Sequence, residues 1–352
     1  MTSPSFRSPP EPAMLPKDSP FHAGEQALQA RVGVRDRLAQ FGRKAIRDFM
    51  PDQHRALFAA LPFVVVGALD GRRRPWASVL FGSPGFMSSP DPRTLRVAAR
   101  PGYGDPIAVG LVPGAPVGLL GIQLETRRRN RMNGTVIETD EAGFVVRVDQ
   151  SFGNCPQYIQ ARTPAFVAEP STVVSPRPVR AERAVLSAGA AALASRADTF
   201  FIATASPAAG GGDPAEGVDV SHRGGKPGFV RVTEDAGRTV LTSPDFRGNS
   251  FFNTLGNLAV NPRAGVVFVD FAAGGLLSLT GEAEVVWDGP ELAAFVGAER
   301  LVRFRVAEGV WIENAVPLRW SAPEPAPQVA ATGSWDDARR PIAAADATKE
   351  SG

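Results

Sequence analysis

Cysteine and histidine are both scarce in this chain of 352 residues, and each scarcity excludes a class of site. The one cysteine, Cys155, has no partner for a disulfide within the chain. That favours a reducing compartment, and we expect the cytoplasm. The three histidines, His22, His54 and His222, show no metal-ligand spacing, and there is no CxxC pair. We therefore expect no metal site.

Long apolar runs and a strong charge of either sign are missing as well. No stretch approaches the ~18 continuous apolar residues of a membrane-spanning helix, and the first 20 residues lack the apolar core of a secretory signal. The 38 basic residues barely outnumber the 36 acidic ones, whereas nucleic-acid binders carry a dense basic face. We therefore expect neither a membrane nor a nucleic acid as a partner.

Nucleotide-binding and hydrolase signatures are also missing. The sequence contains no GxGxxG after a strand, no GxxxxGK[ST] and no GxSxG. The segment 223–228 is rich in glycine, but Pro227 stands where a Ser or Thr would hold a metal ion. We interpret this segment as a hairpin turn.

The chain does contain a helical start followed by two β-rich stretches. Apolar residues recur at helical spacing over 22–59, with a break near Pro51, and short alternating or β-branched runs follow. Three prolines within 170–180 indicate a linker, the alanine-rich 182–196 predicts a helix, and strands then return. Many short strands with turns between them predict a barrel or a sandwich.

The two β-rich stretches repeat each other, which is the most informative feature of the chain. Five landmarks occur in the same order in both halves, among them the pairs Phe63 and Phe200, Gly82 and Gly225, and Asn133 and Thr280. Chance similarity between two β-rich halves is the alternative. A true duplication predicts that the halves pack as a pseudo-dimer, with a pseudo-twofold axis in place of a homodimer interface.

The second half carries several short motifs in order. They are Val220-Ser-His-Arg-Gly-Gly-Lys-Pro-Gly-Phe-Val230, Thr242-Ser-Pro-Asp-Phe-Arg-Gly-Asn-Ser250, Asn253-Thr-Leu-Gly-Asn257 and Asn261-Pro-Arg263. This series resembles the FMN-binding split barrel of the pyridoxamine 5'-phosphate oxidase superfamily, in particular its uncharacterised bacterial members. The resemblance covers about residues 196–290 well and 60–165 more weakly, and it leaves the outer segments unmatched.

The resemblance implies a mainly β fold with flanking helices, in which two tandem FMN-binding split β-barrels form a pseudo-dimer. The expected parts are a disordered N-terminal segment (1–20), a helical lead-in with a first, degenerate barrel (21–169), a linker (170–181), a second barrel with the FMN-binding motifs (182–320) and a disordered tail (321–352). In this superfamily the cofactor lies between two barrels, where Arg, Lys, Ser and Thr side chains hold its phosphate.

Carried over position by position, the resemblance places residues of the second half at the cofactor. His222 is the candidate catalytic residue, a proton donor near the flavin. The expected FMN-binding residues are Ser221, Arg223, Thr242, Ser243, Arg247, Asn249, Ser250, Asn253 and Thr254. A phosphate favours a guanidinium, hydroxyls and free N–H groups at a helix start, which the stretch 247–250 offers. Solvated strand-edge residues and a simple helix cap are the alternative.

Two departures from the superfamily bear on the activity. Neutral residues near Asn253 and Thr254 replace the basic pair that the oxidases have at the helix start. The C-terminal Arg and His segment that binds substrate in the oxidases has no counterpart here. We therefore do not expect pyridoxamine phosphate oxidation.

The first half departs further, because Asp105 replaces the Asn-Ser pair and would repel a phosphate. We expect this barrel to be degenerate and to serve as a partner wall. Alternatively, the basic residues Arg127, Arg128, Arg129 and Arg131 reach across to an anionic substrate or to the FMN phosphate. On a strand, residues 127, 129 and 131 share one face, which could equally be a solvated outer face.

Three further residues have more than one interpretation. Cys155 could be a redox thiol beside the flavin or a buried structural cysteine. Tyr158 could donate a hydrogen bond at a site. His22 lies near a predicted helix start, where we expect it to cap or to pack.

The function that follows is an FMN-dependent oxidoreductase acting on a small organic substrate, with an electron-donor reductase as a candidate partner. The first alternative is a non-catalytic protein that binds or carries a flavin or a tetrapyrrole, because one fold hosts many functions. A purely structural interaction protein is the second alternative. The chain is expected to be a monomeric pseudo-dimer or a homodimer.

Overall fold

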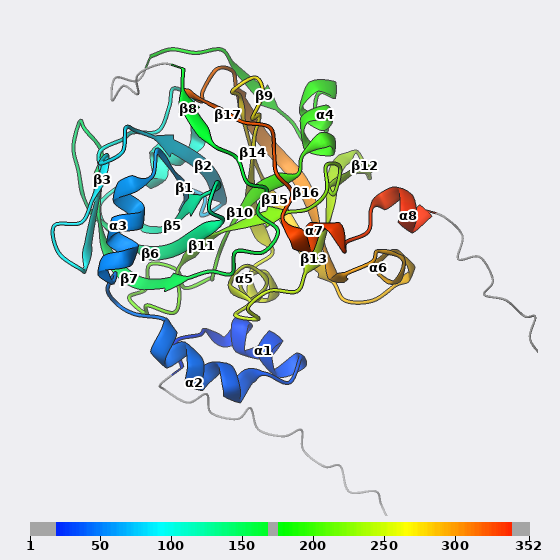
Figure 1. Ribbon diagram of the computed structural model, residues 1–352, viewed down its shortest axis with the longest axis horizontal. Coiled ribbons are helices and arrows are strands. Elements are labelled where there is room, and N and C mark those ends of the chain that lie inside the picture. Colours follow the sequence, from blue (N-terminus) through cyan, green and yellow to red (C-terminus); the bar gives the residue numbers. More distant parts are fainter. Residues whose placement is uncertain (1–18, 168–174, 340–352) are drawn as a thin grey trace, which may run out of the picture.

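The computed structural model describes residues 19–167 and 175–339 and is mainly β with short helices (Figure 1). The first half forms an antiparallel sheet of seven strands in the order β2-β1-β5-β6-β7-β4-β3. Its elements are β1 (Phe63–Leu69), β2 (Pro75–Phe81), β3 (Met87–Ser88), β4 (Thr94–Val97), the 3-10 helix η1 (Pro106–Gly110), β5 (Pro116–Gln123), β6 (Arg128–Thr139) and β7 (Phe144–Gly153).

The second half repeats this arrangement strand for strand, in the order β11-β10-β14-β15-β16-β13-β12, with β9 (Val179–Glu182) added beside β16. Its elements are β10 (Thr199–Ala205), β11 (Val218–Gly224), β12 (Arg231–Asp235), β13 (Arg238–Phe246), α5 (Asn253–Val260), β14 (Arg263–Val269), β15 (Leu276–Val286), α6 (Pro290–Ala294) and β16 (Ala298–Ile312). Two identical strand orders are the topology that a duplication predicts, with α5 in the place of η1.

An equivalent glycine marks the bend of the long strand in each half. Gly134 in β6 and Gly281 in β15 both lie at a register shift, and their neighbours Asn133 and Thr280 are equivalent by strand pairing. A Cβ would lie 2.1 Å from the facing carbonyl oxygen at Gly134 and 2.0 Å from it at Gly281. The neighbouring backbone therefore comes close enough to require glycine at both positions.

Each sheet curls around a core of its own and remains open, with β2 and β3, or β11 and β12, as its edges. A third apolar cluster lies between the halves, where Val65 and Val79 of the first pack with Phe201 and Val267 of the second. Burying these faces against each other stabilises the association, because apolar area removed from water contributes roughly 25 cal/mol per Å². The molecule is thus a pair of split barrels joined as a pseudo-dimer.

Three helices precede the first sheet: α1 (Ala23–Arg31), α2 (Arg35–Ala45) and α3 (Asp52–Ala60). His22 caps α1, since its Nδ1 accepts a hydrogen bond from the Gly24 N–H at 3.1 Å, as its position before a helix predicted. Although α1 precedes the first barrel, it packs against α5 of the second (Figure 1). Asn253 of α5 donates to the buried Glu25 at 2.5 Å, and burial raises the pKa of Glu25 well above its usual value.

Three sequence expectations differ from the structure. Residues 321–339 of the expected tail are ordered as α7 (Pro327–Ala330) and α8 (Trp335–Arg339), because the buried Trp335 packs edge-on against Phe295 and donates to the carbonyl of Phe229. The end of the expected linker forms β9, and the helix predicted over 182–196 is α4 (Ala188–Arg196), capped by Ser187. Strand pairing also matches Phe63 with Thr199 and not with Phe200.

The remaining expectations on order fall on parts of the chain that the structure leaves undescribed, namely 1–18, 168–174 and 340–352. A two-stranded sheet of β8 (Pro164–Phe166) and β17 (Leu318–Trp320) ties the end of the first half to the end of the second. Within the described ranges, no helix has the length and apolar character needed to cross a membrane.

Candidate functional site

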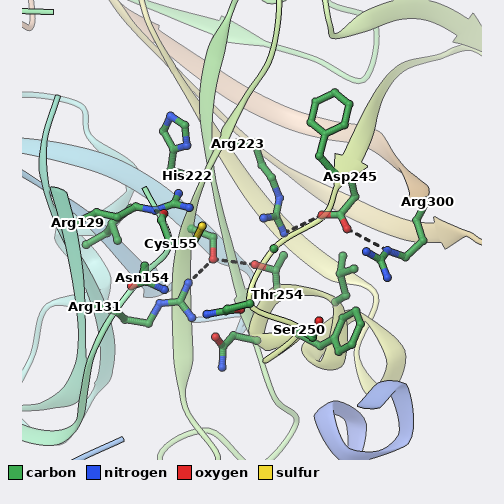
Figure 2. Close-up of a pocket in the computed structure, with 18 residues that line it drawn as sticks. Arg129, Arg131, Asn154, Cys155, His222, Arg223, Asp245, Ser250, Thr254 and Arg300 are labelled. Carbon is green, nitrogen blue, oxygen red and sulfur yellow. Dashed lines mark hydrogen bonds and ion pairs between the residues drawn. The ribbon is translucent and has the colours of Figure 1, made fainter. Parts of the chain in front are cut away.

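A cleft lies between the two halves, where the loop after β13 leads into α5 (Figure 2). Its walls come from β6 of the first half and from β11, β13, α5 and β16 of the second. We call it the arginine cleft, and its principal residues are Arg129, Arg131, Asn154, Cys155, Ser221, His222, Arg223, Asp245, Asn249, Ser250, Asn253, Thr254 and Arg300.

Four arginines face one aspartate among the residues that line the arginine cleft. Arg129 and Arg131 come from the first half, whereas Arg223 and Arg300 come from the second (Figure 2). Asp245 is the carboxylate. Guanidinium groups in a partly enclosed space of low dielectric concentrate positive potential, so the cleft favours anionic ligands.

Arg131 is held at the base of the cleft by a buried network. One guanidinium nitrogen donates to Asp219 at 3.0 Å, and the other donates to the Ser221 hydroxyl and to the carbonyl of Val220. The Thr254 hydroxyl also donates to Ser221, at 2.9 Å. Ser221 accepts twice, so its own O–H remains free to donate to a ligand. In the described part of the chain, the buried Arg131 Nε has no hydrogen-bond partner.

Asp245 joins the two arginines of the second half. Its carboxylate lies 3.0 Å from Arg300 and 3.6 Å from Arg223 (Figure 2). Burial lowers the pKa of Arg223, and the neighbouring Arg131 and Arg300 lower it further, while Asp245 opposes them. Arg300 also donates to Glu299, yet both guanidinium groups keep unused donors, because each has five N–H bonds in a planar fork.

Arg129 has no carboxylate partner in the described part of the chain. Its Nε donates to the carbonyl of Cys155 at 2.6 Å. Burial lowers the pKa of Arg129, and the cationic Arg223 and Arg131 lower it further. An anionic ligand would relieve this repulsion, so Arg129 gains more than the other arginines from one that binds in the cleft.

His222 is buried on β11, with the edge of its ring toward Phe201 at a centroid distance of 5.6 Å. Burial lowers its pKa well below the usual value, and Arg129, Arg223 and Arg162 lower it further. The imidazole is therefore neutral at physiological pH, and its Nε2 has no hydrogen-bond partner among the residues that the structure describes. A neutral His222 is a poor proton donor, but it offers one hydrogen-bonding nitrogen at the cleft.

The start of α5 faces the arginine cleft without a side-chain cap. Ser250 and Phe252 just before it have φ of 59° and 64°, the left-handed region that non-glycine residues seldom adopt. Asn249 stabilises this turn by accepting from the Phe251 N–H at 3.1 Å. The first N–H groups of a helix have no partner within it, so they stay available to an anion at this end.

Seven of the ten predicted site residues meet in the arginine cleft. They are Ser221, His222, Arg223, Asn249, Ser250, Asn253 and Thr254. Asn253 directs its side-chain amide to Glu25, away from a ligand. Thr242 and Ser243 do not line the cleft; both are buried within β13, and Ser243 borders a small apolar cavity inside the second barrel.

Arg247 is exposed and lines a smaller pocket that continues the arginine cleft past Arg223. Tyr158 forms part of this extension and stacks on Phe246, with ring centroids 4.9 Å apart and planes 25° apart. Tyr158 has a φ of 63°, a strained backbone of the kind that clusters at functional sites. The enclosed volumes are small, about 100 Å³ in the cleft and about 60 Å³ in the extension, so a larger ligand would lie along the open side.

The sequence flagged Arg129 and Arg131 only within a group of four, and the structure separates that group. Arg127 donates to the carbonyl of Ile159 and pairs with Glu324, while Arg128 donates to the carbonyl of Gln53. Asp245 and Arg300 were missed altogether. No local motif signals these two residues, because they meet only where β13 and β16 pair side by side, and those strands are far apart in the sequence.

The pseudo-twofold axis relates the arginine cleft to positions that are almost uncharged. Strand pairing gives the equivalences. Each pair gives the residue of the cleft, or the Asp219 that holds Arg131, before its equivalent. The pairs are Arg129 and Leu276, Arg131 and Ser278, Asp219 and Trp76, Ser221 and Ser78, and Arg223 and Leu80. At the place of the α5 turn, the buried Asp105 accepts from Ser78 and from the Ile107 N–H. Within the described ranges, these equivalent positions thus give the duplicated fold a charged cleft on one side of the axis and not on the other.

Neither the known protein-family models nor the curated proteins include a match to this chain. Solved structures that resemble parts of it include HupZ of Group A Streptococcus (14% identity, 35% of this chain and 90% of that chain, TM-score 0.26). A candidate pyridoxamine 5'-phosphate oxidase of Lactobacillus delbrueckii (15%, 30% and 95%, 0.24) and the haem storage protein HutZ of Vibrio cholerae (12%, 35% and 90%, 0.23) are also similar. Such low TM-scores carry no inference about function, which must come from the cleft itself.

Proposed function

We propose that the arginine cleft binds FMN and that the protein is an FMN-dependent oxidoreductase acting on a small organic substrate. The observation that carries this proposal is the convergence of guanidinium groups from both halves on the uncapped start of α5. A phosphate monoester takes up to three hydrogen-bonded oxygens and a double charge, which matches this set of donors.

The unused polar atoms of the cleft support the same ligand class. Three buried atoms have no hydrogen-bond partner within residues 19–167 and 175–339, namely Arg131 Nε, His222 Nε2 and Asn154 Oδ1. Buried polar atoms are normally paired, so three that border one cleft suggest a ligand with both donors and acceptors. The enclosed part of the cleft suits the phosphate end, and the residues of its open side and extension would contact the rest of the cofactor.

The roles of the residues follow from their positions. Arg129, Arg131 and the first N–H groups of α5 would hold the phosphate, and the Ser221 hydroxyl would donate to it. Arg223 and the neutral His222 lie farther along β11 and would donate hydrogen bonds to the ring. When bound, FMN supplies the hydride or electron transfer, and the protein supplies its orientation and electrostatic surroundings.

The first test compares FMN with riboflavin, which lacks the phosphate. We expect purified protein to retain FMN after desalting, with bands near ~375 and ~450 nm, and to bind riboflavin more weakly. The substitution Arg129→Gln should weaken FMN binding about 10- to 100-fold, because a hydrogen bond to a charged group contributes about 1.5–3 kcal/mol. It should leave riboflavin binding unchanged.

The matched control is Arg128→Gln, which removes the same charge one residue away on a side chain that contacts Gln53 outside the cleft. Arg128→Gln should bind FMN as the unchanged protein does. A colourless protein that fails to retain FMN, or equal losses in the two variants, would contradict the proposal.

A carrier of a tetrapyrrole is the second candidate, and His222 is the observation that favours it. A neutral imidazole with a free nitrogen is the form that ligates haem iron, and burial holds His222 in that form. The same spectra separate the two candidates. A tetrapyrrole carrier would show a Soret band in place of the flavin bands, and His222→Ala would lose that band.

A further inference from the structure

A third pocket adjoins the arginine cleft and belongs to neither barrel alone. It lies between α2 and the turn before α5, and its main walls are Phe41, Lys44, Arg47, Cys155, Asn249 and Phe251. We call it the α2 pocket. Its volume is about 530 Å³, within the range of small-molecule sites. Cys155 and Asn249 line both this pocket and the arginine cleft, so the two spaces share a wall.

The side chains of the α2 pocket combine an aromatic wall with two cations. Phe41 is 56% exposed although its ring lies 6.0 Å from that of the buried Phe251, so one aromatic face remains open. Lys44 and Arg47 form no ion pair within the described residues, and none of the pocket's lining residues is acidic. Apolar area and unpaired cations together favour a flat organic anion.

The helix behind the pocket is anchored by apolar packing. Leu38 and Ile46 anchor α2 in an apolar cluster with Phe21, Phe152 and Phe251. Gly42 lies so close to Phe21 that an added Cβ would be 2.6 Å from its ring. The backbone that carries the pocket's side chains is therefore fixed by packing on the side of α2 that faces the core.

We propose that the α2 pocket binds an aromatic carboxylate or a similar flat organic anion as a second ligand. Phe41 and Phe251 contact the rings, and Lys44 and Arg47 bind the acidic group. The shared wall of Cys155 and Asn249 brings this ligand next to the arginine cleft. If this ligand is the substrate that reacts with the flavin, that role rests on the proposed function. The binding of the ligand to the α2 pocket does not rest on it.

The test uses 8-anilinonaphthalene-1-sulfonate, a fluorescent aromatic anion, titrated against the full chain with and without FMN. We expect the double substitution Lys44→Gln/Arg47→Gln to weaken binding about tenfold, because each partly exposed ion pair contributes a factor of a few. The control Arg37→Gln/Arg43→Gln removes two exposed charges from the same helix outside the pocket and should change nothing. The uncharged analogue N-phenyl-1-naphthylamine should be insensitive to both pairs.

Three results would overturn the proposal. They are equal affinity in all variants, an equal loss in the control pair, and displacement of the probe by FMN, which would make the α2 pocket part of the cofactor site. Failure of the proposed function looks different. The protein would then retain no FMN, but the probe would still depend on Lys44 and Arg47.

Discussion

Arg129 and Arg131 lie two residues apart on β6 and carry the same charge, yet their surroundings differ. Arg131 is paired with Asp219 and donates to Ser221, so besides facing the cleft it ties the two halves together. Arg129 has only the carbonyl of Cys155. The residue with the fewest protein partners is therefore the one whose loss should affect a ligand most and the fold least.

Asp105 is a buried carboxylate whose negative charge opposes folding. Burial raises its pKa to about 6, against the hydrogen bonds from Ser78 and Ile107. The folded state then holds the Asp105 proton more tightly than the unfolded state, so stability falls as pH rises from about 4 through about 6. Above that range Asp105 is ionised in both states, so the folded state bears the whole free-energy cost of burying the charge.

We therefore predict that Asp105→Asn stabilises the protein at neutral pH by about 2–3 kcal/mol, the equivalent of its raised pKa. The advantage should shrink as pH falls and vanish below about pH 3, where Asp105 is protonated in both states. Urea unfolding at several pH values measures this, with the exposed Asp288→Asn as control. A gain that does not vary with pH would show that burial of the charge is not the cause.

The two long bent strands carry the clearest record of duplication at the level of elements. Gly134 and Gly281 occupy equivalent bends in β6 and β15. The segment of β6 before Gly134 presents Arg129 and Arg131 to the cleft, while its equivalent in β15 presents Leu276 and Ser278. One backbone solution is thus kept in both halves while the side chains diverge.

We predict that Gly134→Ala destabilises the protein by about 1–3 kcal/mol, because its Cβ would overlap the carbonyl oxygen of Arg147. The control Gly71→Ala, in a hairpin with open space around it, should stay within about 0.5 kcal/mol of the unchanged protein. Thermal unfolding measures both. If the two variants melt alike, the close approach at the bend does not require glycine.

The sequence predicted most strands and the repeat correctly, but it did not predict contacts between elements far apart in the chain. Turn residues and β-branched runs marked most strands, and the order of landmarks revealed the repeat. The α5 turn and β11 were located because their motifs are contiguous. Asp245 and Arg300 were not, because their pairing depends on strands far apart in sequence. Trp335 was placed in a tail because nothing local shows that it packs on Phe295.

For the whole molecule, the decisive property is that a symmetric fold carries an asymmetric site. A homodimer of such barrels would present two equal clefts, one on each side of the axis. In this chain, one of the two positions has gained arginines from both halves. The other has Trp76, Leu80 and Leu276, which are buried in apolar clusters. Duplication within one chain makes this possible, because each half can change independently.

The stoichiometry of FMN binding tests this account most directly. Calorimetric titration of the full chain, stripped of any retained ligand, should give one FMN per chain, with binding weakened by Arg129→Gln from the first half. Arg128→Gln, which removes the neighbouring charge outside the cleft, should leave both the affinity and the stoichiometry unchanged. Two equivalents per chain, or none, would contradict the claim that a single arginine cleft between the halves is the cofactor site.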